Sequence, residues 1–161
     1  MRFVCLLALI AFAGCHSQVY RGDDLQKVVD PRVTSFTNQQ MALIKAGQVE
    51  FALQQLSDTA RDPAKFNEHR DKARRMLEAA NVLGGSIVSY KIIEAEKTTV
   101  PADNIPEMKN EPHVTTEPHD GIIVRIEAEY QHGAARLEFM FALVDGEWKS
   151  SGFGMMFRPT S

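Results

Sequence analysis

The sequence predicts an α+β domain in which N-terminal helices pack on one face of a curved antiparallel sheet of about four strands. Three observations predict this class. Apolar residues recur at helical spacing between positions 42 and 80, the period shortens to two after Gly84-Gly85, and Asp145-Gly146 is a hairpin signal between two apolar runs. With 161 residues, of which 44% are hydrophobic, the chain is long enough for one core.

The helical part falls into two stretches. Over residues 35–57 an apolar stripe is interrupted by Gly47, so that either one helix tolerates a glycine or two short helices meet there. Asp62-Pro63 predicts the start of another helix, with aspartate as N-cap and proline in the first turn. Gly84-Gly85 predicts its end.

Strands are predicted over residues 86–100, 121–131, 135–143 and 147–157, where apolar and polar residues alternate. Ile92-Ile93 breaks the alternation in the first of these strands and predicts a bulge.

The chain begins with a basic residue and an apolar run over 3–13, which is too short to cross a bilayer as a helix. This pattern is typical of a secretory signal. The end of the run, Phe12-Ala13-Gly14-Cys15, resembles the bacterial lipobox. That resemblance implies a signal peptide over residues 1–14 and fatty-acyl (palmitate-type) modification of Cys15, which would anchor the chain to a membrane.

The lipobox interpretation divides the chain into a signal peptide (1–14), a lipidated N-terminus and tether (15–33) and a single α+β domain (34–158). Cys5 would leave with the signal peptide, so that the mature domain would have no disulfide. His16, rather than aspartate, follows Cys15. By resemblance to Gram-negative lipoproteins, this implies retention at the outer membrane with the domain facing the periplasm.

Two segments also resemble the nuclear transport factor 2-like superfamily. They are residues 45–53 (KAGQVEFAL) between two helices and residues 145–149 (DGEWK) leading into the last strand. A cystatin-like arrangement is the nearest alternative. The resemblance implies a fold over about residues 34–158 and no particular activity.

The long connection before the second strand contains a repeated Glu-Pro-His. Its candidate metal ligands are Glu111, His113, Glu117, His119 and Asp120. Imidazole and carboxylate groups are ligands that Zn²⁺ accepts. However, the prolines keep the segment extended, so the ligands need not converge, and a solvated or partner-facing loop is the alternative.

His69, on a helix flank, and Tyr130, on the inward face of a strand, are the candidates for a pocket between helices and sheet. An acid–base pair needs a second titratable group close by. No acidic residue is expected on the inward strand faces, so we predict no catalytic residues and no cofactor.

The second face of the last two strands is unusually apolar for a wet surface and is the predicted interface. The candidate residues are Met140, Ala142, Val144, Trp148 and Met156. Coverage of this face by the tether or by the long loop is the alternative interpretation.

A net charge of −3, spread along the chain, argues against nucleic-acid binding. We therefore interpret the sequence as a membrane-anchored, non-enzymatic lipoprotein that binds an envelope protein or a second copy of itself. One alternative is a small-molecule pocket protein or minor enzyme of the same fold. Another is an immunity or inhibitor lipoprotein that acts against an envelope toxin.

Overall fold

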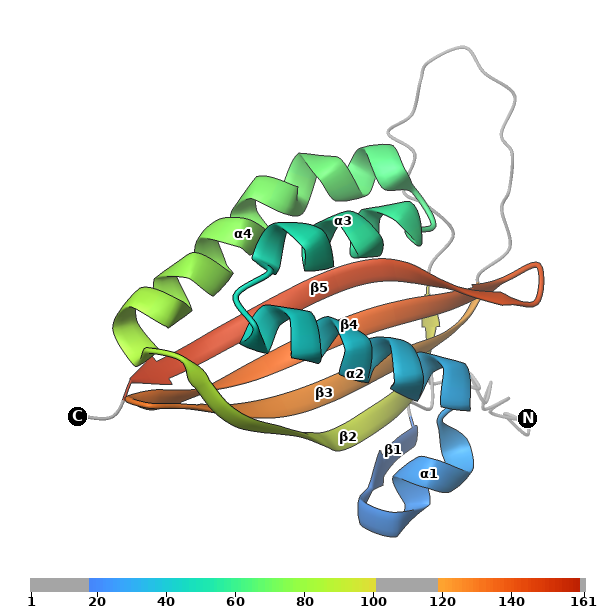
Figure 1. Cartoon of the computed structure of the whole chain (residues 1–161). Coiled ribbons are helices and arrows are strands. Elements are labelled where there is room, and N and C mark those ends of the chain that lie inside the picture. Colours follow the sequence, from blue (N-terminus) through green and yellow to red (C-terminus); the bar gives the residue numbers. More distant parts are fainter. Residues whose placement is uncertain (1–17, 101–118, 160–161) are drawn as a thin grey trace, which may run out of the picture.

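The computed structural model describes residues 18–100 and 119–159, which form a five-stranded open antiparallel sheet with helices on one side (Figure 1). The strand order is β1-β2-β3-β4-β5. The elements in chain order are β1 (Gln18–Arg21), η1 (Gly22–Asp24), α1 (Leu25–Val28), α2 (Pro31–Lys45), α3 (Val49–Asp58), α4 (Pro63–Gly84), β2 (Ile87–Val100), β3 (His119–Tyr130), β4 (Gly133–Val144) and β5 (Glu147–Pro159). The predicted α+β class is confirmed.

The sheet has five strands rather than about four, because β1 arises from the segment for which the sequence predicts a tether. Its four residues pair antiparallel with β2, with Arg21 opposite Glu94. A four-residue strand whose partner lies more than 70 positions away carries almost no local signal. The alternation of apolar and polar residues therefore does not predict β1.

The rest of that segment also belongs to the fold. Val29 and Val33, which flank the start of α2, are 7% and 1% exposed and lie in the hydrophobic core. Asp30 is the N-cap of α2, where its side chain accepts a hydrogen bond from the Arg32 backbone N–H at 2.8 Å. Residues 18–33 therefore form part of the domain, through the pairing of β1 with β2 and the packing of Val29 and Val33, and do not form a separate tether.

Gly47 separates two helices rather than interrupting one. It has a φ of 75°, in the left-handed region that ends an α-helix, and no atom lies within 4 Å of where its Cβ would be. The last helix, α4, begins and ends as predicted. Asp62 accepts a hydrogen bond from the Lys65 backbone N–H at 3.0 Å, and Gly85 ends the helix with a φ of 76°.

The helix-facing side of the sheet forms the core. Val124, Ile126, Leu137 and Phe139 are all fully buried on this side. The pairing of β2 with β3 shifts by one residue between Ile92 and Glu94, which confirms the predicted bulge.

A further register shift lies between β4 and β5. Met140 is opposite Gly152 while its neighbour Phe141 is opposite Ser150, so Ser151 is an extra residue in β5. In β5, the side chains of even-numbered residues face the helices before Ser151, and those of odd-numbered residues face the helices after it. The bulge therefore decides which β5 side chains enter the core.

Candidate functional site

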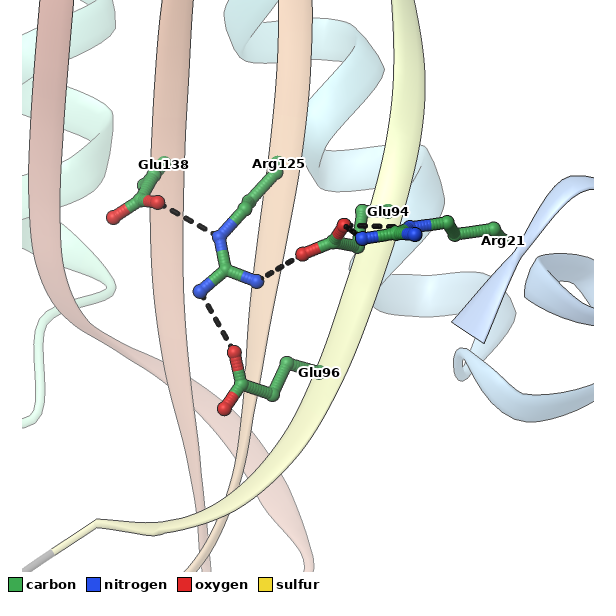
Figure 2. Close-up of polar contacts among 5 residues, drawn as sticks. All are labelled: Arg21, Glu94, Glu96, Arg125 and Glu138. Carbon is green, nitrogen blue, oxygen red and sulfur yellow. Dashed lines mark hydrogen bonds and ion pairs between the residues drawn. The ribbon is translucent and has the colours of Figure 1, made fainter. Parts of the chain in front are cut away.

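The face of the sheet opposite α2, α3 and α4, here called the open face, carries a cluster of charged side chains. Its members, here called the Arg125 cluster, come from β1, β2, β3 and β4 and are shown in Figure 2: Arg21, Glu94, Glu96, Arg125 and Glu138. Cross-strand pairing explains their proximity, since Arg125 lies opposite both Glu94 and Glu138.

Each nitrogen of the Arg125 guanidinium donates to a different glutamate. Nε donates to Glu138 Oε1 at 2.8 Å, Nη2 donates to Glu96 Oε2 at 2.7 Å, and Nη1 donates to Glu94 Oε1. The second oxygen of Glu94 accepts from Arg21, whose Nη2 lies 2.7 Å away. The cluster therefore joins four strands through their side chains.

The centre of the cluster is shielded from solvent although it lies on a sheet surface, whereas Arg21 and Glu138 at its margins are exposed. The side chains of Arg125 and Glu94 are 17% and 8% exposed. Hydrogen bonds from Arg21 and Arg125 lower the pKa of Glu94 despite the opposing effect of its burial. Burial opposes the charge of Arg125, but its hydrogen bonds to the three glutamates outweigh this and raise its pKa. Arg125 is thus a permanent cation, and its ion pairs with the three glutamates link β2, β3 and β4 on the open face.

The predicted interface residues divide between the two faces. Met140 and Val144 are half-buried on the open face, Ala142 is fully buried in the same row, and Met156 is 59% exposed there. Trp148 lies on the helix side instead, where it packs against the core and its Nε1 donates to Asp30 Oδ2 at 2.9 Å. The prediction that Trp148 lies on the open face is therefore wrong, because the bulge at Ser151 places Trp148 and Met156 on opposite faces of β5.

A groove of about 660 Å³ lies between α4 and the outer edge of β5, and we call it the α4–β5 groove. His69 is exposed and lines this groove, but Tyr130 does not. Tyr130 is 5% exposed and lies edge-on to Phe157, with ring centroids 5.3 Å apart. Burial raises the pKa of Tyr130 to about 12, and its hydroxyl has no hydrogen-bond partner among the described residues. The structure therefore does not bring the two pocket candidates together.

The candidate metal ligands are only partly placed. Glu111, His113 and Glu117 lie outside the described residues, as does Cys15. His119 and Asp120 are the first residues of β3, and adjacent strand residues point to opposite faces. Within residues 18–100 and 119–159, no group of three or more histidine, cysteine, aspartate or glutamate side chains is placed to hold a metal ion.

The sequence predicts the strand that carries Arg125, over residues 121–131, but it does not predict the Arg125 cluster. The available signal was a single arginine within an apolar strand, together with Glu94 and Glu96 spaced by two in the preceding strand. Only the register of the two strands shows that these three side chains meet. The α4–β5 groove had no signal of this kind, because it forms between segments that are about 80 residues apart.

Comparisons with protein-family models, with curated proteins and with solved structures find no match to this chain. In the part of the chain that the structure describes, no helix is both long and apolar enough to cross a bilayer.

Proposed function

We propose that this chain is a lipid-anchored protein of a bacterial envelope whose domain is a non-enzymatic binding module. Acylation of Cys15 would hold it to the outer membrane, facing the periplasm. The proposed domain is nuclear transport factor 2-like, with a cystatin-like arrangement as the alternative. Helices before an antiparallel meander, and a helix pair joined at Gly47, support this assignment. A fold by itself does not imply an activity, so the function is argued from the surface.

One observation carries the proposal: the three long helices all lie on one side of the sheet, and the other side presents the open face (Figure 1). Val19 at β1 and Met156 at β5 are 45% and 59% exposed there. Between them the charged side chains neutralise one another across strands. Besides the Arg125 cluster, Lys91 lies 3.2 Å from Glu127, which is opposite Arg136.

A second copy of the chain is the occupant that this face suits best. A surface on which acidic and basic side chains alternate has no net charge with which to repel an identical surface. Two-fold symmetric association requires a self-complementary patch of this kind. An envelope protein of another sequence is the competing occupant.

Sedimentation velocity of residues 16–161 over a range of concentrations tests the association. We expect a dimer, and we expect Met156→Glu to shift the protein to monomer, because it places a charge at an apolar contact. Val82→Glu is the matched control, since Val82 is 84% exposed on α4, away from the sheet. A monomer at all concentrations would exclude the second copy as occupant.

Anchoring is tested separately with Cys15→Ser in the full chain. We expect the wild type to sediment with membranes and to incorporate labelled palmitate, and the variant to lose both properties. A variant that remains with the membrane fraction would rule out the lipid anchor while leaving the binding module untouched.

A further inference from the structure

A second cavity lies at the end of the sheet where β1 begins, and we call it the end cavity. Its volume is about 450 Å³, which is in the range of sites that bind small molecules. Residues 27–31, which run from α1 into α2, cover it, and the neighbouring ends of β2, β3, β4 and β5 form its floor. The end cavity shares no lining residue with the α4–β5 groove.

The inner wall of the end cavity is apolar. Val29 and Ile122 are 7% and 3% exposed, and the half-buried Leu143 and Trp148 extend this wall toward solvent. The hydrogen bond from Trp148 Nε1 to Asp30 satisfies the polar end of the indole, so that its ring remains as apolar surface. The wall is therefore suited to contact with a hydrocarbon chain.

The rim of the end cavity carries four charged side chains, of which two are already paired. Lys27 Nζ lies 3.2 Å from Asp24 Oδ1. Asp30 Oδ2 accepts a hydrogen bond from Arg32 Nη2 at 2.8 Å. A ligand that enters the cavity therefore meets Lys27 and Asp30 as members of neutralised pairs.

The other two charges, those of Lys97 and Asp120, are free to contact a ligand. Lys97 Nζ lies 5.9 Å from the centroid of the Tyr20 ring, and across residues 18–100 and 119–159 neither charge has an oppositely charged partner. Lys97 is opposite Ile122 and Thr99 is opposite Asp120, so the two charges lie on the same face of neighbouring strands. The end cavity thus offers one cation and one anion beside an apolar wall.

The end cavity lies close to the proposed membrane anchor, and this step rests on the proposed function. Gln18, the first residue of β1, pairs with Lys97. Cys15 precedes Gln18 by three residues, which span at most about 11 Å when fully extended. The head-group layer on each side of a bilayer is roughly 5–8 Å thick. Acylation of Cys15 would therefore hold the rim of the end cavity near lipid head groups.

We propose that the end cavity binds a phospholipid whose head group carries both a phosphate and a primary amine. The phosphate contacts Lys97 and the amine donates to Asp120, while the first part of an acyl chain lies against Trp148 and Leu143. This contact orients the domain, with the β1 end of the sheet toward the bilayer. An acyl anchor by itself restrains only the distance of the domain from the membrane.

The fluorescence of Trp148 reports on the end cavity directly, because the chain contains one tryptophan. Residues 16–161, which include every residue that the structure describes, are titrated with dihexanoyl phosphatidylethanolamine below its micelle concentration. We expect a saturable change in emission and ¹⁵N amide shifts centred on residues 27–31, 97–98 and 120–122. Dihexanoyl phosphatidylcholine, whose head group has no N–H, is expected to bind about fivefold more weakly or worse.

Substitutions on the rim test the role of each charge. Asp120→Asn is expected to weaken binding of the ethanolamine lipid by about fivefold and to leave the choline lipid within about twofold. Lys97→Gln is expected to weaken binding of both lipids, since both carry the phosphate. Lys91→Gln is the matched control, because Lys91 is an exposed lysine of the same strand that lies 3.2 Å from Glu127 and outside the end cavity.

The orientation at the membrane is tested with the acylated chain in mixed ethanolamine and choline vesicles that carry a nitroxide quencher on the head group. We expect quenching of Trp148. The control combines Trp148→Phe with Val82→Trp, which moves the tryptophan to a position that is 84% exposed in the wild type. It lies near the end of α4, beside the opposite end of the sheet, and is expected to be quenched much less.

Three outcomes would overturn the proposal whatever the state of Cys15: no saturable binding at millimolar ethanolamine lipid, shifts centred outside the end cavity, or equal effects of Lys91→Gln and Lys97→Gln. Tighter binding of an anionic glycerol head group would also overturn it, because Asp120 would then have no role. Lipid binding by residues 16–161 without palmitate on Cys15 in cells would support the end cavity and exclude the anchor. Palmitate on Cys15 without lipid binding by residues 16–161 would do the reverse.

Discussion

Trp148 and Asp30 form a hydrogen bond between two residues that are 118 positions apart, with the indole Nε1 2.9 Å from Asp30 Oδ2. Asp30 is also the N-cap of α2, and its other oxygen accepts from the Arg32 backbone. One carboxylate therefore starts the first long helix and attaches it to the first residues of the last strand.

Replacing Asp30 is expected to destabilise the domain through both contacts. Asp30→Ala removes the cap and leaves Trp148 Nε1 without its acceptor, with an expected cost of about 2 kcal/mol in the free energy of unfolding. Asp30→Asn keeps a capping oxygen and is expected to cost less. Urea unfolding of both variants and of Trp148→Phe measures this. If the Asp30→Ala and Trp148→Phe effects are simply additive in the double variant, the hydrogen bond contributes nothing.

Acid is expected to destabilise the domain through Asp30 and Glu94. Hydrogen bonds from Arg32, with a further one from Trp148, lower the pKa of Asp30, and those from Arg21 and Arg125 lower the pKa of Glu94. A carboxyl group whose pKa is lower in the folded state contributes stability that is fully present above about pH 5 and is lost as the pH falls through about 4 and below.

Urea unfolding at a series of pH values checks this dependence. Asp30→Asn and Glu94→Gln are each expected to flatten the fall in unfolding free energy between about pH 5 and pH 2. If the unfolding free energy of both variants falls with pH as steeply as that of the wild type, other groups cause the acid sensitivity.

Arg125→Gln is expected to cost about 2–4 kcal/mol in the free energy of unfolding, because the shielded Glu94 and Glu96 then lose the cation that they share with Glu138. Arg136→Gln is the matched control: it is an exposed arginine on the same face, one strand away, and should change stability by less than about 0.5 kcal/mol. Thermal unfolding of both proteins gives the comparison. At lower pH the difference in stability between Arg125→Gln and the wild type should become smaller, since protonation of the glutamates removes their mutual repulsion.

Gly84→Ala is expected to destabilise the domain by about 1–2 kcal/mol, although alanine is the better helix former. A Cβ there would lie 2.7 Å from two ring atoms of Phe157 and 3.0 Å from Tyr130 Cβ. Unfolding of Gly84→Ala with and without Phe157→Leu checks the cause. If the smaller side chain at position 157 does not recover part of the loss, crowding by the ring is not the reason.

Helix ends and strand periods were predictable because their causes are local. Asp62 and Gly85 delimit α4 through contacts with residues within four positions, and the period of two marks β2 to β5 in the same way. Gly47 was ambiguous because a glycine is compatible with both a tolerated interruption and a helix end. Only its φ of 75° decides between them.

The candidate sites depended on contacts across strands, which no local pattern contains. Glu94 and Arg125 meet because a bulge at Ile93 sets the register of β2 against β3. Trp148 faces the helices because a bulge at Ser151 reverses the alternation of β5. Shifting a register by one residue moves every later side chain to the other face, so one bulge changes a whole surface.

The sequence by itself determined the α+β class, the caps and length of α4, and the positions of the four long strands, since each rests on interactions between near neighbours in the chain. The tertiary structure alone decided that residues 18–33 join the fold, that the Arg125 cluster forms, and that a groove lies between α4 and β5. These features are set by register, bulges and the packing of distant segments, where side chains from different parts of the chain compete for the same space.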